Sequence, residues 1–276
     1  MIPPIASNFV AGETPVEAVN HVDRLNNRGV SGILNLLGEH YEQQKNADAD
    51  AEAYVSLAND IADRDTDACL SVKASQIGLE ISDAVFEENL ARIVGAADCF
   101  VWIDMEDHPT TDVTLDAYER HALETDGNVG VCVQANLKRT REDLERLADL
   151  PGKVRLVKGA YDEPTEIAYE TKAKVDESYR ECLRYMFKSF DDGIAVGSHD
   201  PEMIDLAKEL HSEYGTPFEI QMLTGVRERA QFELAEQGYD VYQYIPYGTK
   251  WFSYFFRRIR ERKENALFAL RAVIGH

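Results

Sequence analysis

Eight short apolar runs, rich in β-branched residues, recur along the 276-residue chain, and segments with the periodicity of amphipathic helices separate them. This alternation favours a parallel sheet, because parallel neighbours need a crossover connection that a helix usually supplies. Eight such units in a chain of this length predict a closed (β/α)8 barrel of the TIM type. The predicted strands are Gly32–Leu36, Leu70–Lys73, Val101–Asp104, Val129–Gln134, Val154–Lys158, Ile194–His199, Phe218–Met222 and Val241–Ile245.

A doubly wound open sheet is the competing α/β architecture for the same alternation. The chain lacks the dinucleotide fingerprint GxGxxG and the phosphate-loop pattern GxxxxGK[ST] that often accompany such sheets. No internal repeat, low-complexity tract or Ser/Gly-rich linker interrupts the pattern. We therefore predict a single barrel domain over residues 1–276.

Three helix starts can be recognised from their capping residues. Thr14 with Glu17, and Thr140 with Asp143, have the spacing of a capping box. Asp200 precedes a proline, which is a favoured residue at the first position of a helix. Each of these positions is predicted to begin a helix between two strands.

The charge balance is strongly acidic, since 50 Asp and Glu residues against 29 Lys and Arg give a formal net charge of −21. Such a surface repels a phosphate backbone, which argues against a nucleic-acid partner. The cations comprise 18 Arg and only 11 Lys. An acidic, lysine-poor surface predicts a halophilic protein, because self-repulsion is screened at a Debye length of about 3 Å in 1 M salt. An ordinary acidic cytosolic protein is the alternative.

The four cysteines stand far apart, without a CxxC pair, and are expected to be reduced thiols. No apolar run approaches the roughly 18 residues of a membrane-spanning helix. The first residues do not show a basic segment followed by an apolar one, so no signal peptide is predicted. These features predict a cytoplasmic protein.

Polar or ionisable residues stand where most of the predicted strands end. In a barrel of this class the carboxyl ends of the strands form the active-site face, so these residues should share one rim. The cations Lys73, Arg155 and Lys158 would face two carboxylates there, and their surplus suggests an anionic ligand or a cofactor on which negative charge develops. The set comprises Lys73, Asp104, Glu106, Gln134, Arg155, Lys158, Ser198, His199, Gln221, Tyr244 and Tyr247.

Other interpretations of the rim stay open from the residues alone. A single Lys or His on an apolar strand is more often structural, and a Schiff-base lyase or aldolase with Lys73 or Lys158 as nucleophile would use the same rim. The motifs HExxH, GxSxG and CxxC are absent, and the seven histidines show no ligand spacing. No metal site and no serine nucleophile are therefore predicted.

A basic, aromatic segment follows the last predicted strand. If it is helical, Tyr254, Arg257, Arg258 and Glu261 share one face, since their spacing is i, i+3, i+4 and i+7. Two arginines beside an aromatic ring can hold a carboxylate through paired hydrogen bonds while the ring covers an apolar group. Arginines that only face solvent are the alternative, and contact with a membrane surface is a third interpretation.

Taken in order, several blocks make the chain resemble proline dehydrogenase, the flavin-dependent first enzyme of proline catabolism. The most specific blocks are RLVKGAY from residue 155 and YxxRRxxE from residue 254, supported by QMLTG from residue 221. The resemblance extends from about residue 8 to residue 271. It implies a distorted (β/α)8 barrel with a C-terminal helix over the active-site face, and FAD held noncovalently across the strand ends.

The resemblance also implies roles for individual residues around the flavin. Arg155 would lie near N5 and O4 of the flavin and act catalytically with Asp104, which would organise the charged network between substrate and flavin. Where the family has Thr-His-Asn after the sixth strand, this chain has Ser198, His199 and Asp200. The implied cofactor contacts are Met105, Gln134, Arg155, Lys158, Gly159, Ala160, Ser198 and His199.

For the substrate, the resemblance implies L-proline, which would be oxidised to Δ1-pyrroline-5-carboxylate by hydride transfer from C5 to the flavin. A quinone is the implied electron acceptor, and coupling to Δ1-pyrroline-5-carboxylate dehydrogenase and peripheral membrane contact are implied possibilities. The implied substrate contacts are Lys73, Leu223, Tyr244, Tyr254, Arg257 and Arg258.

Overall fold

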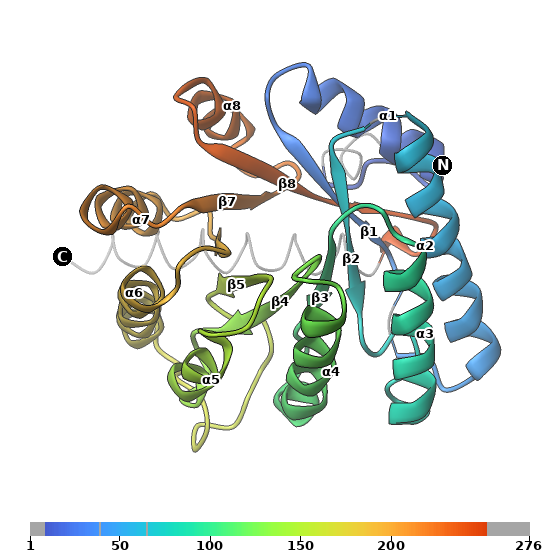
Figure 1. The fold of residues 1–276 in the computed structure, drawn as a ribbon, viewed down its shortest axis with the longest axis horizontal. Coiled ribbons are helices and arrows are strands. Elements are labelled where there is room, and N and C mark those ends of the chain that lie inside the picture. Colours follow the sequence, from blue (N-terminus) through green and yellow to red (C-terminus); the bar gives the residue numbers. More distant parts are fainter. Residues whose placement is uncertain (1–8, 39, 65, 253–276) are drawn as a thin grey trace, which may run out of the picture.

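The computed structural model describes residues 9–38, 40–64 and 66–252, and within them eight parallel strands close into one barrel. The strands follow one another around the barrel in chain order, and the last pairs with the first, from Ser31 opposite Tyr242 to Leu36 opposite Tyr247 (Figure 1). The strands are β1 (Ser31–Leu36), β2 (Ala68–Lys73), β3 (Val101–Asp104), β4 (Val129–Gln134), β5 (Lys153–Val157), β6 (Ile194–Gly197), β7 (Phe218–Leu223) and β8 (Asp240–Tyr247). The predicted barrel is confirmed.

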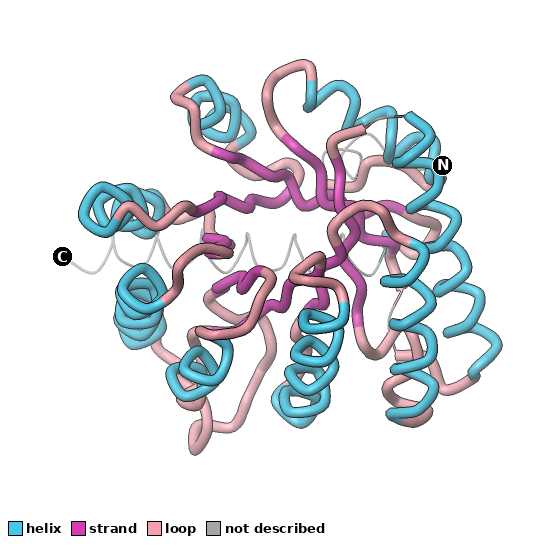
Figure 2. Tube along the Cα trace, viewed as in Figure 1, coloured by secondary structure: helices cyan, strands magenta, loops and turns pink. Residues whose placement is uncertain are grey.

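Helices surround the strands, as Figure 2 shows, and cover the outer face of the barrel. They are α1 (Pro15–Asn26), α2 (Gln44–Arg64), α3 (Asp83–Ala96), α4 (Thr111–Glu124), α5 (Thr140–Leu147), α6 (Lys172–Ser189), α7 (Pro201–Tyr214) and α8 (Glu228–Glu236), with a 3-10 turn at His108–Thr110. No helix in the described part of the chain is long and apolar enough to cross a bilayer. The predicted C-terminal helix lies outside the described residues.

Helices begin at all three predicted starts, and two of the predicted caps are confirmed. Thr14 forms a complete capping box with Glu17, and the Asp200 side chain accepts a hydrogen bond from the backbone N–H of the second helical residue. The capping box predicted at Thr140 is wrong, because this residue is already the first residue of α5. Its hydroxyl donates 2.5 Å to the carbonyl of Gln134 and so ties the helix to the end of β4 instead of capping it.

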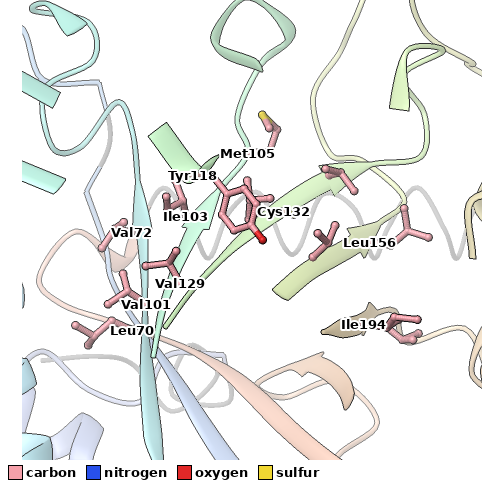
Figure 3. Packing of buried hydrophobic residues seen from close by; sticks show 14 of the residues in the cluster. Leu70, Val72, Val101, Ile103, Met105, Tyr118, Val129, Cys132, Leu156 and Ile194 are labelled. Carbon is pink, nitrogen blue, oxygen red and sulfur yellow. The ribbon is translucent and has the colours of Figure 1, made fainter. Parts of the chain in front are cut away.

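Alternating side chains of each strand point to opposite sides of the barrel wall. The outward set packs beneath the helices in one large apolar cluster, part of which Figure 3 shows around Leu70, Val72, Val101 and Ile103. This burial supplies most of the driving force for folding, at about 25 cal/mol per Å² of apolar surface. The inward set contains a small apolar layer, formed by Ile33, Cys69, Trp102 and Ala195.

Above that inner apolar layer, the side chains inside the barrel are mostly polar. Two glycines make room for large side chains inside the barrel. A Cβ on Gly130 would lie 2.6 Å from the Trp102 ring, and one on Gly197 would lie 2.7 Å from Cγ1 of Val157 and 3.2 Å from Cγ of Arg155. The missing side chains therefore allow a tryptophan and an arginine to occupy the middle of the barrel.

Candidate active site

A cavity of about 380 Å³ opens at the carboxyl ends of the strands, above the inner apolar layer. Its wall combines cationic and other polar groups with apolar ones, a combination typical of sites for small molecules and cofactors. The lining residues come from all eight strands and from the loops that follow them. They are Asn35, Lys73, Asp104, Met105, Cys132, Arg155, Val157, Lys158, Gly159, Ala160, Tyr161, Gly197, His199, Gln221, Met222, Leu223 and Tyr244.

All eight strands of the barrel contribute to this cavity wall. Each strand supplies at least one inward-facing residue near its carboxyl end. In chain order from β1 to β8 these residues include Asn35, Lys73, Asp104, Cys132, Arg155, Gly197, Gln221 and Tyr244.

An ion pair between Arg155 and Asp104 lies at the centre of this wall. Both side chains are almost fully buried, with 5% and 13% of their surfaces exposed. Asp104 also accepts hydrogen bonds from the hydroxyl of Ser71 at 2.7 Å and from that of Tyr244 at 2.6 Å. The guanidinium lies 4.9 Å from the centroid of the Trp102 ring, in the range of a cation–π contact. The buried charges are therefore paired and hydrogen-bonded.

The same cluster determines which groups carry charge. Burial opposes the charged form of Arg155, but Asp104 together with the neighbouring Cys132 and Tyr244 outweighs this effect, and the pKa of the guanidinium is raised. Burial, followed by the charge on Asp104, raises the pKa of Tyr244 well above its ordinary value. At neutral pH the cluster therefore contains a fixed cation and a neutral phenol that donates to the carboxylate.

Lys158, at the end of β5, is held by two carboxylates that are not part of the predicted rim network. Its Nζ forms ion pairs with Asp176 of α6 and, at 2.7 Å, with Asp200 at the start of α7. Burial opposes ionisation of both carboxyls, but the contacts with Lys158 and Lys172, joined at Asp200 by a backbone hydrogen bond, together outweigh it and lower the pKa of each. A lysine whose ammonium is engaged by two carboxylates is a poor nucleophile, which disfavours the Schiff-base alternative at this position.

The predicted pairing of the rim cations with Glu106 is also only partly realised. The Glu106 carboxylate accepts hydrogen bonds from the backbone N–H of Ser75 at 2.7 Å and from its hydroxyl at 2.8 Å. Burial raises the pKa of Glu106, and these hydrogen bonds act in the opposite direction. Arg155 and Lys158 have their ion pairs with other carboxylates, so Glu106 ties the loop after β2 to the loop after β3.

A second cavity, of about 510 Å³, lies beside the first and shares residues 158–161 of its wall. The side-chain oxygen of Asn136 is buried at this cavity and has no hydrogen-bond partner within the described chain. Gly159 lies against the same side chain, with a φ of +105° and no room for a Cβ, which would be 2.1 Å from the Asn136 oxygen. The backbone therefore approaches this cavity closely, and an acceptor there is left for a ligand.

Comparison with known families decides what this barrel is. Residues 18–271 match the family model described as proline dehydrogenase. The chain belongs to the proline dehydrogenase family. It is 38% identical over 275 residues to proline dehydrogenase 1 of Bacillus subtilis subsp. natto, covering 98% of this chain and 90% of that protein. It is 36% identical over 282 residues to a proline dehydrogenase of Deinococcus radiodurans, again covering 98% and 90%.

Solved structures of similar fold include proline utilization A proteins. The structure from Bdellovibrio bacteriovorus, described as inactivated by N-propargylglycine, superposes with a TM-score of 0.85 at 24% identity. The one from Corynebacterium freiburgense gives 0.79 at 22% identity. The present chain spans about a third of those longer chains, 32% in both cases. At these identities the likeness supports the fold alone.

Most of the site residues that the sequence predicted for this proline dehydrogenase family member lie together. Gln134 and Ser198 do not line the cavity: the Gln134 amide bridges the carbonyl of Glu106 and the N–H of Ala160, and the Ser198 hydroxyl accepts from the N–H of Asp200. Tyr254, Arg257 and Arg258 fall outside the described residues. Those that line the cavity are Lys73, Asp104, Met105, Arg155, Lys158, Gly159, Ala160, His199, Leu223 and Tyr244.

Sequence reasoning missed several polar residues deeper in the barrel. Asn35 and Ser71 both point inward among apolar neighbours, and the Asn35 amide donates 2.9 Å to the carbonyl of Ser71. Gln221 was placed on the rim but given no role, although it accepts a hydrogen bond from Arg155. The sequence pattern indicates these residues, because a polar residue at every second position of an otherwise apolar strand predicts a polar barrel interior.

Proposed function

We propose that this chain is an FAD-dependent oxidoreductase that oxidises L-proline to Δ1-pyrroline-5-carboxylate, the first step of proline catabolism to glutamate. The observation that carries the proposal is the buried cluster of Arg155, Asp104 and Tyr244 at the barrel mouth of a proline dehydrogenase family member. Such a cluster offers fixed positive charge beside an apolar wall, where a substrate and a flat cofactor can meet.

The residues present fit FAD. The first cavity has an apolar side formed by Met105, Val157 and Leu223, which suits a flat ring system. The second cavity extends the site beyond Lys158, as an elongated dinucleotide requires. The unpartnered acceptor on Asn136 there suits a hydroxyl or amino donor such as those of an adenosine. We propose that Lys158, Gly159, Ala160 and His199, with the nearby Gln134 and Ser198, hold the cofactor.

When bound, FAD would supply the two-electron acceptor for the hydride that leaves C5 of proline, with its N5 as the accepting atom. Arg155 would stabilise the negative charge that develops on the cofactor, and it is already oriented by Asp104 before the reaction begins. Tyr244 and Leu223 would enclose the apolar ring of proline, and Lys73 would lie near its carboxylate. Because its pKa is raised, the Tyr244 phenol is a hydrogen-bond donor to Asp104 and not a base.

An absorption spectrum tests the proposed function directly. The purified chain reconstituted with FAD should show a flavin spectrum, and anaerobic L-proline should bleach it, whereas anaerobic glycine should not. A chain that retains its fold but takes up no FAD would contradict the proposal. Borohydride trapping of a carbonyl substrate on a flavin-free chain would instead favour the Schiff-base alternative.

We propose that Arg257 and Arg258, with Lys73, bind the proline carboxylate, and that Tyr254 helps to enclose the proline ring. This clamp gives a second prediction. Arg258→Met should raise KM for proline by about tenfold to hundredfold while FAD remains bound, because a charge-assisted hydrogen bond to the carboxylate is lost. Steady-state kinetics with flavin quantification provide the measurement, and Arg180→Met is the control, because Arg180 forms an exposed ion pair with Glu202 on the barrel surface. An unchanged KM in the Arg258 variant would contradict the clamp.

The remaining features of the reaction are proposals that follow from the family. We propose a quinone as electron acceptor, supplied at a membrane that the chain contacts peripherally, and functional coupling to Δ1-pyrroline-5-carboxylate dehydrogenase. A cytoplasmic location and a single domain over residues 1–276 are proposed with them. Turnover with a soluble quinone analogue tests the acceptor, since a chain that reduces FAD but transfers no electrons to quinones would contradict it.

We also propose that the acidic surface adapts the chain to concentrated salt. The net charge of −21 gives strong self-repulsion at low ionic strength, and salt screens it. The urea midpoint of unfolding should therefore rise markedly between dilute buffer and molar KCl. Equal stability in the two conditions would leave the acidic composition as that of an ordinary cytosolic protein.

A further inference from the structure

A chain of hydrogen bonds continues from Arg155 toward the opposite end of the barrel. The Arg155 Nη1 donates 3.0 Å to the Oε1 of Gln221, and the Nε2 of Gln221 donates 2.6 Å to the Oε1 of Glu219. The other oxygen of Glu219 forms an ion pair with Lys153. Gln221 and Glu219 are inward-facing residues of β7 and are buried, while Lys153 begins β5.

The chemistry of these groups allows Gln221 only one orientation. A guanidinium can only donate hydrogen bonds and a carboxylate can only accept them. The amide of Gln221 must therefore turn its oxygen toward Arg155 and its nitrogen toward Glu219. The reverse orientation would place two donors face to face at Arg155 and two acceptors face to face at Glu219, with the buried groups left unsatisfied.

This arrangement fixes the plane of the Arg155 guanidinium. Asp104 and Ser71 hold Nη2, and Gln221 holds Nη1. With two corners of the planar group anchored, rotation about either single contact is prevented. Without Gln221, Nη1 would lose its amide partner, and the plane of the guanidinium would be held less strictly.

Neither Lys153 nor Glu219 lines the cavity at the barrel mouth; both border a cavity at the other end of the barrel. The charges of Lys153 and Glu219 therefore do not contact a ligand bound at the barrel mouth. A buried ion pair is also weak support for stability, because an apolar pair of similar volume often serves as well. The Lys153 ammonium balances the carboxylate and lies 5.1 Å from the centroid of the Phe100 ring.

We propose that Lys153, Glu219 and Gln221 form a positioning relay that orients Arg155 toward the cofactor from the far end of the barrel. The inference rests on the proposed function, because its consequence is measured on bound FAD. Glu219 sets the direction of the Gln221 amide, Gln221 sets the plane of the guanidinium, and Lys153 holds the other oxygen of Glu219 in an ion pair. None of the three needs to touch the substrate.

Gln221→Met tests the relay without changing net charge. The variant should bind FAD, but its preference for the reduced over the oxidised flavin should fall about tenfold, which for a two-electron couple lowers the midpoint potential by about 30 mV. Its kcat should fall about tenfold, with KM for proline within twofold of the parent value. Gln243→Met is the matched control, since Gln243 is equally buried on the neighbouring strand but bonds to Gln231 and Thr224.

A second variant separates orientation from packing at Gln221. Lys153→Met with Glu219→Gln keeps the net charge and leaves Gln221 in place, but a glutamine at 219 no longer dictates the direction of the amide. The double variant should show a potential shift of the same sign, and the Gln243→Met control should show none. A parent-like potential and kcat in both test variants would overturn the relay, as would an equal shift in the control. A parent chain that binds no FAD would overturn the proposed function, and the relay with it.

Discussion

Replacing Arg155 with Met should lower kcat for proline oxidation by about 10², because the only guanidinium at the centre of the described cavity wall would be lost. FAD binding should weaken as well, since a fixed positive charge beside the cofactor disappears. The fold should survive, because Asp104 keeps its hydrogen bonds from Ser71 and Tyr244. Methionine also fills much of the volume of the arginine stem.

Stopped-flow reduction of bound FAD by proline, together with titration of the apoprotein with FAD, measures these effects. Arg180→Met is a suitable control, because Arg180 forms an exposed ion pair with Glu202 on the barrel surface. Such a surface pair contributes at most about 1 kcal/mol, so the control should match the parent in both assays. A fully flavinated and fully active Arg155→Met variant would refute the assigned role.

Replacing Asp104 with Asn should reduce the free energy of unfolding of the apoprotein by about 3 kcal/mol, because Arg155 would be left as a buried charge without its carboxylate. The hydrogen bonds that Asp104 accepts add to this loss of stability. Arg155, Ser71 and Tyr244 all donate to the two oxygens of Asp104, and an amide nitrogen in place of one oxygen would face a donor. Urea denaturation of parent and variant provides the measurement.

A double replacement shows whether the loss comes from the unpaired charge. Asp104→Leu with Arg155→Met removes both charges, and its stability should return to within about 1 kcal/mol of the parent, because an apolar pair avoids the cost of burying ions. Oxidation of proline should remain abolished in that variant. If Asp104→Asn alone were as stable as the parent, the ion pair would not be structurally important.

The barrel itself could be predicted from the sequence because its signal is local. Each strand is a short apolar run and each helix has its own period, so the observed strand bounds differ from the predicted ones by only a few residues. The fold then places the end of every strand on one face. This is why Lys73, Asp104, Arg155 and Tyr244 could be assigned to one rim before any coordinate was known.

The partners of these side chains were harder to predict, because they depend on contacts between distant segments. Tyr244 and Asp104 are 140 positions apart and meet only because the barrel closes. Lys158 was expected to face the rim carboxylates but pairs with Asp176 of α6 and with Asp200, the N-cap residue of α7. Charge alone does not determine which of many carboxylates a given lysine will meet.

The sequence by itself determined the alternation of strands and helices, the family, and the set of polar residues at the strand ends. Each of these depends on local spacing or on motifs in a fixed order along the chain. Only the tertiary structure decided that the polar set continues through the barrel as Ser71, Gln221, Glu219 and Lys153. The physical reason is that a side chain inside a closed barrel must satisfy its hydrogen bonds with residues of other strands. Those neighbours are set by closure and register, and not by distance along the chain.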